Sequence, residues 1–89
     1  MDYNINENGV EILIETCQRN TRSEIISQFV ACRKEKNLTQ ENLSELTGIA
    51  RSNIARFESG NYNPTLDMMV RIATAMDMKI NIKLEKKTS

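Results

Sequence analysis

The sequence predicts an all-α domain of five helices followed by one C-terminal β-strand. Apolar residues recur at three- and four-residue spacing along most of the chain, which is typical of amphipathic helices. From Ile80 onwards they alternate with polar residues, which is typical of a half-buried strand. A chain of 89 residues forms one domain at most, and it buries only about 60% of the surface that its unfolded form exposes. A dimer or another partner is therefore expected to contribute to its stability.

The first expected helix covers residues 10–17. Val10, Leu13, Ile14 and Cys17 follow the spacing of a helical stripe. Because Val10, Ile12 and Ile14 also alternate with polar residues, a short strand is the alternative.

Capping residues divide the next part of the chain into two further helices. Thr21 or Ser23 can cap the second helix, which we expect to run to about Lys36. Thr39 can cap the third helix, and Gly48 is expected to end it in the left-handed conformation. The side chains expected to face the core are Ile25, Ile26, Phe29, Val30, Leu43 and Leu46.

The fourth helix is expected from about Ala50 to Glu58, and Thr65 can cap the fifth after the turn-rich residues 60–64. Their expected core residues are Ile54, Phe57, Leu66, Met69, Ile72, Ala73 and Met76. The predicted strand then places Ile80, Ile82 and Leu84 on one face. A lone strand has unpaired backbone groups, so the same strand of a second copy is its simplest partner.

Charge is balanced overall but divided between the two ends. The 12 basic and 12 acidic side chains cancel. Residues 1–20 hold four acidic residues and one basic residue, a sum of −3, whereas residues 78–89 hold four lysines and one glutamate, a sum of +3. This difference suggests separate roles for the two ends.

The composition excludes most enzyme classes. With no histidine, the chain lacks the commonest general base and every histidine-containing catalytic dyad or triad. It has no glycine-rich phosphate loop and no paired carboxylates at a recognisable spacing, and two cysteines cannot form a zinc site alone. We therefore expect no catalytic residue, metal or cofactor, and we expect Cys17 and Cys32 to be free thiols.

Residues 40–59 carry the functional signal, because they combine the features of a helix-turn-helix. Ser44 is small where two helices would touch, and Gly48 tolerates the positive φ of the turn. Ile49, Ile54 and Phe57 would anchor the second helix, which leaves its outer face available to the DNA major groove.

With these residues, the chain resembles the Cro/phage-repressor (XRE) helix-turn-helix family over about residues 24–78. The resemblance implies a lambda-repressor-like DNA-binding domain. Two positions depart from the family pattern: Ser44 stands where alanine is usual, and Thr47 stands where an apolar residue is frequent. The matching positions are Leu38, Thr39, Gln40, Leu43, Gly48, Ile54, Phe57, Glu58, Gly60, Pro64, Leu66, Ile72, Ala73 and Met76.

The resemblance also implies roles for individual residues. The residues that it implies to contact base edges are Arg51, Ser52, Ala55 and Arg56. Of these, Arg51 suits a guanine, because its guanidinium can form paired hydrogen bonds to O6 and N7. Arg33 and Glu58 match a structural ion pair of the family. Contacts to the DNA backbone are expected from Thr39, Gln40, Asn53, Asn61, Tyr62, Asn63 and Thr65.

Within that family, the chain is most similar to HigA-like and HipB-like antitoxins, which dimerise, bind their own operator and neutralise a toxin. The size, the predicted terminal strand and the extra acidic N-terminal segment carry this similarity, and an acidic segment would suit a basic toxin. The alternatives are a standalone or phage-type regulator without a toxin and, outside DNA binding, a protein-binding adaptor.

The predicted organisation has three parts: an acidic segment with a short helix (1–22), the DNA-binding domain (23–78), and a dimerisation strand with a tail (79–89). The expected partners are a palindromic DNA duplex, a second copy and a cognate toxin. No signal peptide or membrane span is recognisable, so we expect a cytoplasmic protein.

Overall fold

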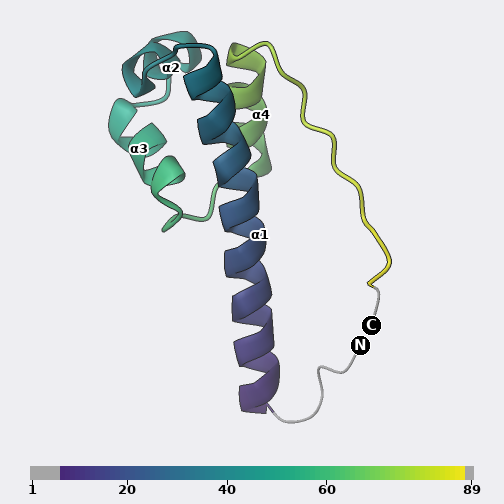
Figure 1. Ribbon diagram of the computed structural model, residues 1–89. Helices are drawn as coiled ribbons and strands as arrows, with labels where there is room; N and C mark the ends of the chain where they lie inside the picture. Colours follow the sequence, from purple (N-terminus) through teal and green to yellow (C-terminus); the bar gives the residue numbers. More distant parts are fainter. Residues whose placement is uncertain (1–6, 88–89) are drawn as a thin grey trace.

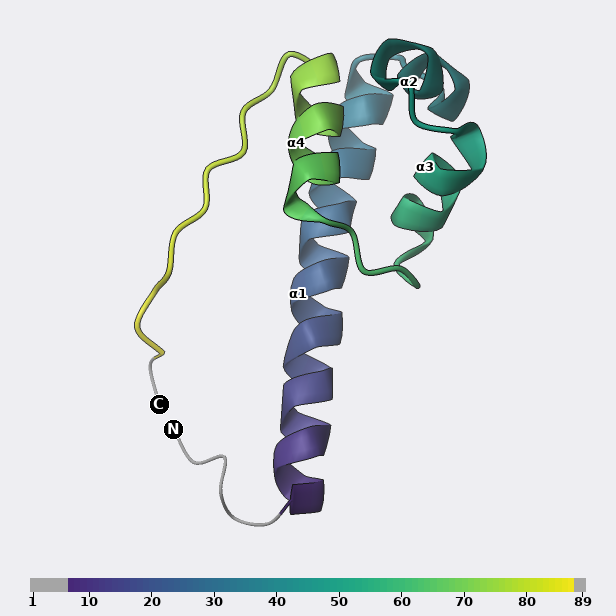
Figure 2. The same ribbon diagram turned by 180° about the vertical axis from the view of Figure 1, so that it is seen from behind.

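The computed structural model describes the backbone of residues 7–87 and the side chains of residues 13–87. It contains one long helix, α1 (Glu7–Glu35), and three short ones, α2 (Gln40–Thr47), α3 (Arg51–Ser59) and α4 (Leu66–Ala75). The second half of α1 packs with the short helices into a small body, and its first half projects beyond them (Figures 1 and 2). We call this projecting half, residues 7–22, the α1 arm.

The prediction of five helices is wrong, because the first two expected helices are one. Residues 10–17 are helical, so the strand alternative is also wrong, and the helix continues without a break through Thr21 and Ser23. The 26 residues from Val10 to Glu35 include no glycine or proline. Nothing therefore interrupts the backbone hydrogen bonds, and residues that favour a cap lie inside the helix instead.

The ends of the short helices follow the predicted signals. The Thr39 hydroxyl accepts a hydrogen bond from the backbone N–H of Asn42, whose side chain in turn accepts one from the Thr39 N–H. Thr65 caps α4 in the same way, by accepting from the N–H of Met68. Gly48 ends α2 with φ 77°, so the predicted left-handed conformation is confirmed.

The core lies where α2, α3 and α4 meet the second half of α1. Phe29 of α1 packs edge to face on Phe57 of α3, with ring centroids 5.2 Å apart. All the apolar side chains in this core are at most 4% exposed, and they are Ile26, Leu43, Ile54, Phe57, Ile72, Ala73 and Met76.

Two side chains that the sequence analysis placed inside are on the surface. Leu46 is 59% exposed and Leu66 is 52% exposed. In α2 the buried side chains are Leu43 and Thr47, four residues apart, which places them on one helical stripe and turns Leu46 away from it. Leu66 is the first residue of α4, and the buried side chains of this helix begin at Ile72.

The predicted C-terminal strand is absent from residues 7–87, so the fold is all-α in the described part of the chain. Residues 79–87, which we call the C-terminal segment, lack regular structure. They run from the end of α4 back toward the level of the α1 arm (Figures 1 and 2). A strand requires hydrogen bonds to a neighbouring strand, and residues 7–87 offer none there. Ile82 and Leu84 are accordingly 66% and 96% exposed.

None of the helices in residues 7–87 has both the length and the apolar character needed to cross a membrane.

Candidate nucleic-acid interface

The turn between α2 and α3 is held by two hydroxyl groups. The Ser44 hydroxyl donates a hydrogen bond of 2.6 Å to the carbonyl oxygen of Ile49. The Thr47 hydroxyl donates to the carbonyl of Leu43 at 2.6 Å and accepts from the backbone N–H of Ile49 at 3.1 Å. Ser44 and Thr47, the two residues that depart from the family pattern, therefore both bind backbone groups at the turn. These hydrogen bonds restrain the angle between α2 and α3.

This turn presents one side of α3 to solvent. Ile54 and Phe57 face the core, whereas Arg51, Ser52 and Asn53, which form the first turn of the helix, are exposed. One turn further along, Arg56 is exposed and Ala55 is half-buried. The five residues expected near DNA from α3 thus begin at its N-terminus and continue along its outer side.

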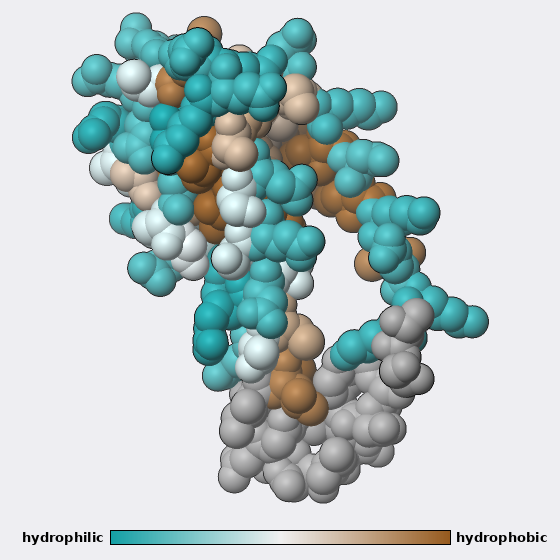
Figure 3. All heavy atoms as spheres, in the orientation of Figure 1, coloured by the Kyte–Doolittle hydropathy of each residue, from teal (hydrophilic) through white to brown (hydrophobic). Residues whose placement is uncertain are grey.

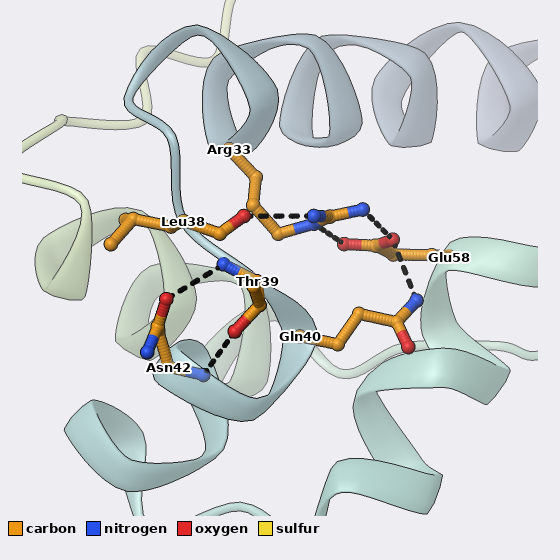
Figure 4. Close-up of polar contacts among 6 residues, drawn as sticks. All are labelled: Arg33, Leu38, Thr39, Gln40, Asn42 and Glu58. Carbon is orange, nitrogen blue, oxygen red and sulfur yellow. Dashed lines mark hydrogen bonds and ion pairs between the residues drawn. The ribbon is translucent and has the colours of Figure 1, made fainter.

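An ion pair joins Arg33 of α1 to Glu58 of α3 (Figure 4). The Arg33 guanidinium donates from Nε to one carboxylate oxygen of Glu58 at 2.7 Å and from Nη2 to the other at 2.9 Å. Its Nη1 donates to the carbonyl of Leu38 at 2.9 Å. The two side chains are 12% and 8% exposed. The hydrogen bond with Glu58 raises the pKa of Arg33, burial lowers it, and the charge of Glu58 raises it again, with a net upward result.

Gln40 links the start of α2 to the same carboxylate. Its Nε2 donates to Oε1 of Glu58 at 3.0 Å (Figure 4). An amide nitrogen carries two hydrogens, so this bond orients the side chain and leaves a second donor. Thr39, one residue earlier, is exposed, but its hydroxyl and its N–H both take part in the cap of α2.

The loop between α3 and α4 is positioned by two arginines. The Arg56 guanidinium lies over the ring of Tyr62, 5.6 Å from its centroid. From α1, Arg22 donates to the carbonyl of Gly60 at 3.2 Å and to the side-chain oxygen of Asn63 at 2.7 Å. Sequence reasoning missed Arg22, because residues 22 and 63 are far apart in the chain and no local pattern joins them.

The expected contact residues thus lie at three places on the body. The start of α2 carries Thr39 and Gln40, and α3 carries the residues expected to read bases. In the loop, Asn61, Asn63 and Thr65 are exposed and Tyr62 is half-buried. The three expected dimer residues, Ile80, Ile82 and Leu84, belong to the C-terminal segment, which runs on the other side of α1 from α3 (Figures 1 and 2).

Comparisons with known proteins identify the family of the chain. The helix-turn-helix family matches residues 31–82, more than half of the chain. An uncharacterised HTH-type transcriptional regulator of Methanothermobacter thermautotrophicus is 48% identical over 44 residues, which are 49% of this chain and 64% of that protein. A second, from Archaeoglobus fulgidus, is 40% identical over 54% of this chain and 68% of its own length.

A phage protein is also similar. The immunity repressor protein of Bacillus phage phi105 is 34% identical over 58 residues, which are 65% of this chain and 40% of the repressor. The chain therefore matches only part of each relative's length. No solved structure shows significant similarity to this one. The family match and the geometry of α2 and α3 together show that the chain belongs to the helix-turn-helix family of Cro/phage-repressor-type transcriptional regulators, a family of DNA-binding rather than enzymatic proteins.

Proposed function

We propose that this protein is a dimeric transcriptional repressor that binds a palindromic operator and blocks a promoter without any chemical step. The observation that carries the proposal is the exposed outer side of α3, which begins with Arg51, Ser52 and Asn53 and is held by the hydrogen-bonded turn. A helix fixed in this way can enter the major groove with its N-terminal residues toward the base edges.

In this proposal, α3 reads the bases. Arg51 pairs with a guanine through O6 and N7, and Ser52 donates to or accepts from a neighbouring base edge. The methyl group of Ala55 meets a thymine methyl. Arg56 contacts a base or a phosphate, with Tyr62 restricting its orientation.

The residues around α3 hold the DNA backbone. Gln40 uses its second amide hydrogen for a phosphate while Glu58 orients it. Such contacts set the position of α3 in the groove and carry no sequence information. The complete set proposed for this role is Thr39, Gln40, Asn53, Asn61, Tyr62, Asn63 and Thr65.

Dimerisation through residues 79–87 would complete the repressor. Ile80, Ile82 and Leu84 alternate with polar residues, and the described chain gives the last two of them little cover. Pairing with the same segment of a second copy would satisfy the backbone groups of both. The two α3 helices would then lie about 34 Å apart, one turn of DNA.

A regulator without a toxin partner is the form of the proposal that the comparisons favour. The relatives described above are named as transcriptional regulators or as a phage repressor. The antitoxin interpretation is the second candidate, and the exposed apolar side chains of the α1 arm favour it, since a toxin could cover them. Leu13 is 46% exposed and Ile14 is 40% exposed.

DNA recognition is tested by selecting a preferred duplex from a random pool and measuring its affinity by fluorescence anisotropy. We expect Arg51→Ala to weaken binding by about 1–3 kcal/mol and to relax preference at one base pair. Arg19→Ala, an exposed arginine on the α1 arm, is the matched control and should bind normally. An equal loss on every sequence would show that Arg51 contacts only phosphate, and failure to select any duplex would overturn the proposal.

Dimerisation is tested by light scattering. Ile82→Lys should yield a monomer whose helical circular dichroism is unchanged, because the side chain is 66% exposed in the single chain. A dimer mass that survives the substitution would contradict the role of the segment.

The antitoxin candidate is tested by co-expression with the neighbouring open reading frame, with the tag on this chain alone. Stoichiometric co-elution of a product that is toxic by itself would establish it. Operator binding without any such partner would establish the free-standing repressor.

A further inference from the structure

Arg22 joins α1 to both ends of the turn that follows α3. Its Nε donates to the carbonyl oxygen of Gly60 at 3.2 Å, and its Nη1 donates to Oδ1 of Asn63 at 2.7 Å. In the described part of the chain, no other hydrogen bond joins residues 60–65 to α1. Arg22 also lies outside residues 31–82, which match the helix-turn-helix family, so the family pattern gives it no role.

The bond from Arg22 decides how the Asn63 side chain is oriented. An arginine side chain has donors and no acceptor, so the atom that faces Nη1 has to be the amide oxygen of Asn63. The amide nitrogen then lies at the other end of the group and has two hydrogens to donate. Asn63 is exposed, and within residues 7–87 its amide nitrogen donates to no protein acceptor. Both hydrogens are therefore available to an acceptor outside the chain.

The backbone around Asn63 is restrained as well. Pro64 follows it, and a residue before proline favours extended conformations. At the other end of the turn, Arg22 holds the carbonyl of Gly60. In the space-filling view, the side of the body formed by α3 and this loop is mostly hydrophilic or neutral (Figure 3). The loop is thus a restrained polar surface next to the helix proposed to enter the major groove.

The charge of Arg22 favours an anion at this loop. Arg33 is paired with Glu58 at 2.7 Å, whereas Arg22 forms no ion pair within the described residues. A charged donor strengthens its bond to an amide and polarises that amide, which makes the amide hydrogens better donors. The guanidinium also makes the potential near the loop more positive. The oxygens of a DNA phosphate are negatively charged acceptors, so they match both features.

We propose that Arg22 is a positioning residue for contact with the DNA backbone: by holding Oδ1 of Asn63, it presents the amide hydrogens of Asn63 to one phosphate. The opposite orientation of the amide would place its oxygen against the phosphate, and two acceptors repel each other. This inference rests on the DNA binding of the proposed function. It adds a residue of the α1 arm to the recognition surface and states which atoms of Asn63 face the DNA.

The test compares the selected duplex with copies in which one phosphate at a time is replaced by an uncharged methylphosphonate. We expect Asn63→Ala to bind the unmodified duplex about tenfold more weakly, as for loss of a hydrogen bond to a charged group. At one phosphate, the methylphosphonate should weaken wild type but cause no further loss for Asn63→Ala. Arg22→Ala should behave in the same way at the same phosphate, and the double variant should bind no more weakly than either single variant.

Arg19→Ala is the control for loss of charge. It removes a positive charge from an exposed position three residues earlier in α1, so it should keep the affinity and the methylphosphonate pattern of wild type.

Asn63→Asp separates the positioning of a donor from simple support of the loop. Aspartate keeps an oxygen for Arg22, but it offers the phosphate no hydrogen and adds a negative charge. We expect weaker DNA binding than for Asn63→Ala, together with a urea midpoint at least equal to that of wild type. Wild-type DNA affinity for this variant would show that Arg22 only supports the loop, and it would overturn the proposal.

Salt dependence distinguishes positioning from direct contact. Each phosphate neutralised by a cation contributes about 0.9 to the slope of log K against log salt concentration. Because the contacting group of Asn63 is neutral, we expect Arg22→Ala to keep the slope of wild type. A slope reduced by about 1 for each subunit, with a loss that adds to that of Asn63→Ala, would show that Arg22 itself contacts phosphate and would overturn the proposal.

The remaining outcomes separate this inference from the proposed function. If Arg22→Ala weakens binding but keeps the wild-type sensitivity at the phosphate of Asn63, Arg22 contributes only to stability and the inference fails. If Asn63→Ala binds as wild type does, Asn63 does not contact DNA and the inference fails, while the effect of Arg51→Ala still tests base recognition. If no duplex can be selected, the proposed function itself fails.

Discussion

The body of this protein and its α1 arm are built from the same helix but have different sources of stability. In the body, Ile26 of α1 is 4% exposed among side chains from α2, α3 and α4. In the arm, Leu13 and Ile14 follow helical spacing equally well but are 46% and 40% exposed. The difference shows that an amphipathic pattern predicts which side of a helix is apolar, but it does not predict which other element, if any, packs against that side.

The two regions also differ in their polar contacts. Arg33, in the body, makes three hydrogen bonds at 2.7–2.9 Å, and Arg22, at the junction, reaches across to the loop before α4. These bonds join residues that are far apart in the sequence. They hold α1 to α3 and to the loop before α4, which carry residues proposed to contact DNA. Residues 7–21 of the arm come before the first of them, so this part of α1 depends on the hydrogen bonds of its own backbone.

The largest expected contrast is between apolar truncations in the two regions. Phe57→Ala removes a ring that is 1% exposed, and we expect a loss of about 3–5 kcal/mol in the free energy of unfolding. Leu13→Ala, in the arm, should cost less than about 0.5 kcal/mol. Urea denaturation followed by circular dichroism measures both, in an Ile82→Lys background so that dimerisation does not contribute. Equal losses would mean that the arm is buried in the monomer.

The next contrast concerns charge. Glu58→Gln removes the negative charge opposite Arg33, and we expect a loss of about 3 kcal/mol, the lower end for a buried pair, because Arg33 keeps its bond to Leu38. Glu24→Gln, an exposed carboxylate of α1, should change stability by less than about 0.5 kcal/mol. The same denaturation measurement compares them, and a neutral Glu58→Gln would show that hydrogen bonding alone maintains the contact.

A smaller effect is expected at the turn. Thr47→Val removes the acceptor of the Ile49 N–H, which is partly buried, so we expect a loss of about 1 kcal/mol, the lower end for a donor left without a partner. Ser44→Ala restores the residue usual in the family and should cost less, because it removes one hydrogen bond whereas Thr47→Val removes two. The prediction fails if Ser44→Ala is the more destabilising of the two.

The smallest effect tests whether the arm unfolds independently. Asn20→Ala replaces an exposed residue of α1 by a better helix former, worth about 0.5 kcal/mol or a little more. We expect slower amide hydrogen exchange in residues 13–22 and an unchanged urea midpoint for the body. A higher midpoint would show that arm and body unfold together.

Much of the body was predictable from the sequence because its signals are local. The capping roles of Thr39 and Thr65 and the left-handed Gly48 follow from residue chemistry within one turn of a helix. All seven buried apolar residues, including Leu43, Ile54 and Phe57, were recognised from helical spacing and the position of the turn.

The predictions that were wrong involved choices between equivalent local signals. Thr21 and Ser23 are suitable caps, yet no residue before them ends the preceding helix, so α1 is continuous. Leu46 and Thr47 are both close to the core stripe of α2, and packing against α4 selected Thr47, which is 9% exposed against 59% for Leu46. The polarity of the side chain did not decide this, since the hydroxyl finds partners in the turn.

By itself, the sequence determined the helical character of the domain, the helix-turn-helix with its exposed residues on α3, and the opposite charges of the two ends. These depend on residue type and spacing within short stretches. Only the tertiary structure decided that α1 projects as an arm, that Arg22 holds the loop before α4, and that the C-terminal segment finds no strand within the described chain. These depend on contacts between residues distant in sequence, whose geometry exists only after the helices have packed.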